Sequence, residues 1–153
     1  MIRRAHVPVI ATASLCFALG AMSGVGLLAP DRASRSAALG PGGRDHRVRL
    51  FVPGTVGREL ASDAQREWSR RVVADFTARF GGSTSFPAEG SWADAGSVIR
   101  EPVIVVESSA TGPELRRSLP EVVRLCQELG ASMRQEAVAL EVDGILWFIK
   151  PPD

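Results

Sequence analysis

The stretch that decides the fold is residues 47–80, RVRLFVPGTVGRELASDAQREWSRRVVADFTARF, because two apolar periods follow one another within it. Residues 47–52 alternate between polar and apolar side chains, which predicts a strand with Val48, Leu50 and Val52 on its buried face. Further along, large apolar side chains recur every fourth residue, which predicts a helix with one apolar stripe. The stripe consists of Trp68, Val72, Phe76 and Phe80.

Local signals mark the ends of this first helix. Ser62 and Gln65 have the spacing of a capping box, so we expect the helix to start at Ser62. Gly81 and Gly82 follow the last apolar position and are expected to end it. The residues between strand and helix, 55–61, are expected to form a loop.

The rest of the chain continues the pattern. Ser118-Leu119-Pro120-Glu121 resembles a second capping box with proline near its first turn, which predicts the start of a second helix. Its expected stripe consists of Leu119, Val122, Cys126, Leu129 and Met133. Strands are expected over residues 83–86, 98–107, 135–142 and 145–149, with turns at 94–96 and at Asp143-Gly144.

The resulting order is β-α-β-β-α-β with one extra C-terminal hairpin strand. This order predicts an α+β fold of the ferredoxin-like class, a two-layer sandwich with two helices on one face of an antiparallel sheet. We expect residues 46–153 to form this domain, preceded by an N-terminal hydrophobic helix.

The segment 7–29 carries no charge and follows Arg3 and Arg4. As a helix it would span about 35 Å, enough to cross a bilayer. Residues 1–30 are therefore predicted to be a transmembrane anchor or a secretory signal peptide, and residues 31–45 a flexible linker. Either would hold the domain at the membrane outside the cytoplasm or secrete it. A start codon at Met22 or later would leave it in the cytoplasm.

Composition excludes several classes of function. The chain has two His and two Cys and lacks Asn and Tyr, so neither a zinc centre nor a disulfide framework is expected. Beyond residue 30, 15 Arg and Lys150 stand against 17 Asp and Glu, which gives a net charge of −1. We expect no nucleic-acid partner, no metal and no cofactor.

Two runs resemble small uncharacterised bacterial domains. The first is Gly90-Ser91-Trp92 with Gly96 and Glu101-Pro102, and the second is Gln135–Gly144, QEAVALEVDG. The resemblance covers about residues 47–149. It implies the ferredoxin-like fold and brings no activity with it.

Four residues are candidates for a binding site. Trp92 lies in a glycine-rich, acid-flanked turn region, where aromatic side chains often recognise partners. Arg58 ends a loop, 54–58, whose backbone amides could hold an anion, as in acylphosphatases, although the chain lacks the Asn that orients their water. Glu101 and Glu136 could meet on neighbouring strands and bind a cation or transfer protons. Cross-strand ion pairs with interleaved arginines are the favoured interpretation of these acids.

Strand alternation also predicts an apolar face on the side of the sheet away from the helices. The residues expected there are Phe51, Ala137 and Ala139, with either Val103 and Val105 or Ile104 and Val106. Val103 and Val105 are the candidates chosen. An apolar patch with a charged rim is typical of an interface, so we expect a second copy to cover it in a two-fold dimer. The alternative is that the linker or the closing hairpin folds over it.

These observations favour a non-catalytic interaction or small-ligand-binding module. The alternative is a small enzyme of the hydrolase or monooxygenase type that uses carboxylate and arginine side chains, by analogy of fold. A concave pocket with convergent polar groups would favour the enzyme.

Overall fold

The computed structural model describes residues 42–94 and 96–152. Its elements follow in the expected alternation of strands and helices. They are β1 (His46–Pro53), β2 (Thr55–Val56), β3 (Glu59–Leu60), α2 (Ser62–Phe80), β4 (Thr84–Asp94), β5 (Ser97–Ala110), α3 (Gly112–Ser132), β6 (Val138–Val142) and β7 (Ile145–Ile149).

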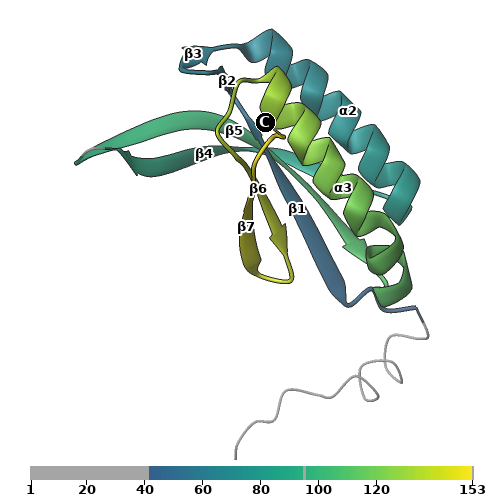
Figure 1. Cartoon of the computed structure of the whole chain (residues 1–153). Coiled ribbons are helices and arrows are strands. Elements are labelled where there is room, and N and C mark those ends of the chain that lie inside the picture. Colours follow the sequence, from purple (N-terminus) through teal and green to yellow (C-terminus); the bar gives the residue numbers. More distant parts are fainter. Residues whose placement is uncertain (1–41, 95, 153) are drawn as a thin grey trace, which may run out of the picture.

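Five strands form an antiparallel sheet in the order β4-β5-β1-β6-β7. Both helices lie on one face of this sheet (Figure 1). This arrangement is the predicted ferredoxin-like α+β sandwich, with β7 as the extra hairpin strand beside β6. The fold prediction is confirmed.

The core lies between the sheet and the helices, and β1 is at its centre. Val48, Leu50 and Val52 are completely buried, as their alternation predicts. They pack in one cluster with the apolar stripes of both helices. This cluster and the five-stranded sheet fall within the described residues, and we expect residues 42–153 to fold as a unit.

Helix α2 starts and stops where expected, but its capping box does not form. Ala61 is the N-cap residue and makes no side-chain cap bond. The Gln65 amide is instead buried and donates to the carbonyl oxygens of Val52 and Pro102, both at 3.2 Å. The Gln65 side chain, which the capping-box spacing assigned to the start of the helix, is thus used in tertiary packing. Gly81 ends the helix with a φ of 76°, as expected for a left-handed C-cap.

The predicted start of the second helix is wrong. Helix α3 begins at Gly112, after a capping box made by Thr111 and Glu114, so Ser118 is buried inside the helix. Pro120 also lies within the helix. The box at Thr111 satisfies the free N–H groups of the first turn, and the helix continues through a proline that costs it one backbone bond.

Four strands also differ from expectation. The expected loop at 55–61 contains the short hairpin β2–β3. Strand β4 runs without a break over Thr84–Asp94, past Pro87 and Gly90, and pairs with β5 along its whole length. Strand β6 starts only at Val138, so Ala137 precedes it.

The predicted membrane segment 7–29 lies outside the described residues. Within residues 42–94 and 96–152, no helix is long and apolar enough to cross a membrane. The end of the predicted linker contacts the domain, because Arg44 donates to Glu114 at 2.9 Å and to the Ser109 carbonyl at 3.0 Å.

Truncation of the central aromatic of α2 tests the core. Phe76 is completely buried and packs edge-to-face on Phe80 with ring centroids 5.5 Å apart. We expect Phe76→Ala to lower the free energy of unfolding of residues 42–153 by about 3–5 kcal/mol in urea denaturation. Arg70→Ala, at an exposed position of the same helix, should change it by less than about 0.5 kcal/mol. Equal effects of the two changes would contradict the assigned core face.

Candidate functional site

The face of the sheet opposite the helices, here called the open face, carries an apolar row that crosses all five strands. Strand registers place one residue of each strand in this row. In strand order they are Phe86, Val105, Phe51, Ala139 and Phe148. Phe51, Val105 and Ala139 lie on this face, since their neighbours Leu50, Val106 and Leu140 lie in the core.

The most exposed residues of this row are not the ones predicted from the sequence. Val103 and Val105 are only 7% and 3% exposed, so neither offers free contact area. Val105 is buried because the rings of Phe86 and Phe51 flank it on neighbouring strands. The large exposed side chains are Phe86, at 40%, and Phe148, at 68%. Both sit on the outer strands.

The β4–β5 hairpin continues this apolar surface beyond the rest of the sheet. Pairing between β1 and β5 ends at Pro53 and Val103, and Glu101 and Pro102 still contact Thr55 and Gln65. Residues 91–94 and 97–100 therefore form a two-stranded arm beyond the rest of the sheet. Figure 1 shows the hairpin reaching past the ends of both helices. Trp92 and Ile99 are paired in the arm with the same parity as Phe86 and Val105, and are 45% and 38% exposed.

A charged row borders the apolar one. Arg49 lies between two carboxylates, at 2.8 Å from Glu107 and 3.4 Å from Glu141. The hydrogen bond to Glu107 is the main cause that raises the pKa of the Arg49 guanidinium. These are the cross-strand ion pairs expected from the interleaved arginines and acids.

Glu101 belongs to a polar cluster near the end of β1. Its carboxylate accepts a hydrogen bond from the Thr55 hydroxyl at 2.8 Å, and the Gln135 amide donates to the Thr55 carbonyl at 3.0 Å. The Gly57 N–H donates to the Met133 carbonyl at 2.8 Å. One backbone amide of residues 54–58, that of Gly57, is therefore already bonded and is not offered to an anion.

The four predicted binding residues do not converge. Trp92 is on the arm, Glu101 is half-buried in the polar cluster, and Arg58 and Glu136 are exposed in the turns beside that cluster. None of them lines either of the two main clefts of the described residues. Sequence reasoning did not place Phe86 on the open face, because Pro87 and Gly90 hid the alternation of β4. It did not place Ile99 and Phe148 there either, because their position depends on strand register.

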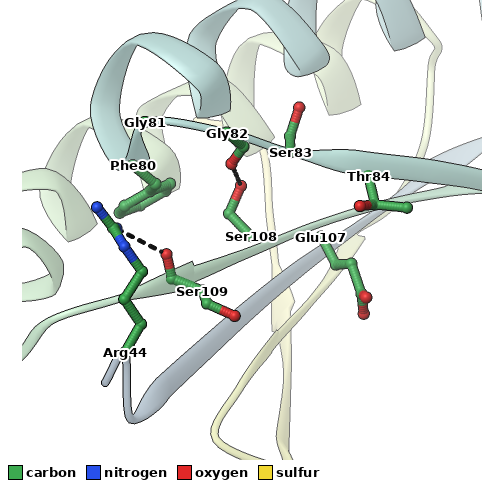
Figure 2. A pocket seen from close by; sticks show the side chains of 9 residues that line it. All are labelled: Arg44, Phe80, Gly81, Gly82, Ser83, Thr84, Glu107, Ser108 and Ser109. Carbon is green, nitrogen blue, oxygen red and sulfur yellow. Dashed lines mark hydrogen bonds between the residues drawn. The ribbon is translucent and has the colours of Figure 1, made fainter. Parts of the chain in front are cut away.

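The larger cleft, of about 390 Å³, lies at the C-terminal end of α2 (Figure 2). Two of its polar contacts lie within the domain. Arg44 donates to the Ser109 carbonyl, and the Ser108 hydroxyl donates to the Gly82 carbonyl at 2.6 Å. The smaller cleft, between the helices, is lined mainly by paired arginines and acids such as Arg79 and Asp75.

Among the described residues, the cysteine and the metal-ligating side chain types form neither a reactive thiol nor a metal site. Cys126 is buried, and burial raises the pKa of its thiol to about 12, so it is a core residue without thiolate character. Within the described residues, no group of three or more His, Cys, Asp or Glu side chains is placed to hold a metal ion.

No protein-family model and no curated protein matches the chain. Solved structures match at the level of fold. A phage SAM lyase in complex with S-methyl-5'-thioadenosine is 18% identical with a TM-score of 0.54, over 71% of this chain and 92% of that one. The same lyase in its apo state gives 18% and 0.53, over 74% and 94%. CutA from Synechococcus elongatus gives 14% and 0.40, over 65% and 76%. The lyase matches agree with the ferredoxin-like architecture, while the motif resemblance to small bacterial domains stays a prediction.

A histidine–aspartate contact joins the start of β1 to the β6–β7 turn. His46 Nδ1 lies 2.7 Å from Asp143 Oδ2, and Asp143 Oδ1 accepts from the Arg47 N–H at 2.8 Å. The bond with His46 is the main cause that lowers the pKa of the Asp143 carboxyl. The contact therefore stabilises the fold above the pKa of the unfolded aspartate, and is lost as the pH falls through the lower, folded pKa.

We expect the melting temperature of residues 42–153 to fall with pH below about 4, where an aspartate ordinarily protonates. Asp143→Asn should keep the turn, because Asn also tolerates the positive φ of 53° at this position. It should melt lower than the wild type at neutral pH and lose less of its melting temperature on acidification. Glu136→Gln, at an exposed position before β6, should follow the wild type. An unchanged acid response of Asp143→Asn would contradict the role of this contact.

Proposed function

We propose that the protein is a non-catalytic interaction module, held at a membrane or exported, that binds a second copy of itself through the open face. The observation that carries this proposal is the continuous apolar surface of that face. It runs from Phe148 across the sheet to Phe86, and then along the arm to Trp92 and Ile99.

In an antiparallel sheet with one face in water, polar residues on that face normally alternate along each strand with apolar residues on the core face. Here the open face presents several large apolar side chains that are 38% exposed or more. In the described part of the chain both helices cover the opposite face (Figure 1). Such a patch, bordered by the Arg49 ion pairs, has the apolar centre and charged rim of a protein interface.

The shape of the patch favours a second copy as its partner. Trp92 and Phe86 project from it, while Gly90, Ala88 and Ala139 on the same face have little or no side chain. A two-fold axis would place the projecting rings of each copy over the small residues of the other. One patch thus supplies both halves of a complementary contact, as an isologous interface requires.

The alternative of a small enzyme or ligand-binding site has less support. The carboxylates and arginines that it would use are paired with each other, as at Arg49 and Glu107, or bonded to the fold, as at Glu101. The fold is shared with a lyase, but a fold hosts many functions. In the larger cleft, Arg44 and Ser108 are likewise bonded to carbonyl groups of the domain.

Removal of the two exposed apolar side chains of the arm tests the interface. We expect residues 42–153 to associate in sedimentation velocity, and Trp92→Ser with Ile99→Ser to weaken association by about tenfold or more. The fold should persist, because both residues lie outside the core cluster.

Leu60→Ser is the matched control for this experiment. Leu60 is 76% exposed and lies on β3, outside the five-stranded sheet, so its replacement should leave association unchanged. A double variant of the arm that associates like the wild type would contradict binding through the open face.

The proposed location rests on the uncharged segment 7–29. Fractionation of cells that produce the full chain should recover it with membranes or outside the cytoplasm, and deletion of residues 1–30 should leave the domain in the cytosol. An intact full chain in the cytosolic fraction would contradict this location.

A further inference from the structure

Strand β7 is an edge of the sheet with apolar side chains on both of its faces. Its residues Ile145, Leu146, Trp147 and Phe148 are 59%, 48%, 54% and 68% exposed. No charged residue lies between Ile145 and Ile149. An unprotected edge of this kind presents free backbone N–H and C=O groups to another strand.

One hydrogen bond identifies the backbone groups of β7 that point to the free edge. The Asp143 N–H donates to the Arg47 carbonyl at 2.9 Å, so the backbone of Asp143 points toward β1 and that of Val142 toward β7. Val142 is paired with Ile145, and successive residues of a strand point to opposite sides. The N–H and C=O groups of Leu146 and Phe148 therefore point to the free edge.

The other edge of the sheet is protected. The same alternation, carried through the registers of β1 and β5, turns the backbone of the odd-numbered residues of β4 outward. Pro87 is one of them, and proline has no N–H to donate. A proline in an outward position is a common device against strand addition. Strand β7 has no such residue, and its edge is the one suited to pairing.

We propose that β7 pairs antiparallel with β7 of a second copy, about a two-fold axis that passes beside Trp147. This register places Leu146 opposite Phe148 and Ile145 opposite Ile149 of the other copy, so every cross-strand pair is apolar. Leu146 and Phe148 then exchange backbone hydrogen bonds with the second copy. The two Trp147 residues face one another as a pair without backbone bonds, where side chains come closest.

Pro151, two residues beyond β7, lies at α3, where a Cβ added to Gly130 would be 3.3 Å from the Pro151 ring. It therefore follows the helix and not the outer edge of β7. The first charge after the strand is Lys150, which the register sets opposite Gly144 of the other copy, where no like charge opposes it.

This interface is separate from the one proposed for the open face. Strand pairing keeps the open faces of both copies on the same side, with a two-fold axis perpendicular to the sheet. The axis of the open-face contact lies parallel to the sheet. Two perpendicular two-fold axes close into a tetramer where they intersect, so both contacts form together when the open-face axis meets the axis beside Trp147.

Opposite charges at position 147 test the register directly. We expect Trp147→Lys and Trp147→Glu each to lose the β7 contact, by about a hundredfold or more in affinity, because each puts like charges face to face. A mixture of the two variants should regain the contact, because only an axis at this residue sets Lys opposite Glu. Sedimentation velocity of residues 42–153 gives the readout, and Leu60→Lys with Leu60→Glu is the control pair.

If both interfaces exist, the wild type is a tetramer, each charge variant a dimer, and the mixture a tetramer. A wild-type dimer that the charge variants reduce to monomers, and that their mixture restores, supports the β7 contact and overturns the open-face contact. Charge variants that assemble like the wild type overturn the β7 contact, and so does a mixture that recovers nothing. A monomeric wild type overturns both.

Discussion

The alternation of side chains along β1 is the constraint on which the rest of the structure depends. Val48, Leu50 and Val52 are buried under the helices, so every second residue of the central strand must point to the other face. Strand pairing passes this parity to β5 and β6, and from them to β4 and β7. A shift of one residue in any register would exchange the core face of that strand for its open face.

The same constraint explains why the open face is apolar. Apolar residues that alternate with core positions, such as Phe51 and Val105, must lie on the side without helices. Apolar area left in water costs about 25 cal/mol per Å² relative to burial. The exposed rings of Phe86, Trp92 and Phe148 therefore favour association, and the proposed self-binding follows from the way the core is built.

Local signals predicted some elements well and others poorly. The apolar stripe of α2, with Trp68 and Phe76, was predicted correctly, and so was the turn at Asp143. Each of these features depends only on residues that are close together in the sequence. The start of α3 was wrong because Ser118 has the same spacing to an acid as Thr111. Sequence spacing does not distinguish a capping residue from one buried in the middle of a helix.

The sequence was sufficient for the order of elements, the helix stripe and the core face of β1, because periodicity is a property of neighbouring residues. It could not show that Phe86, Phe51 and Phe148 share one row, since register joins residues far apart in the chain. Nor could it show that Arg49 lies between two acids, or that Gln65 serves the core and not a cap. Those arrangements come from packing five strands against two helices, where long-range contacts override local preference.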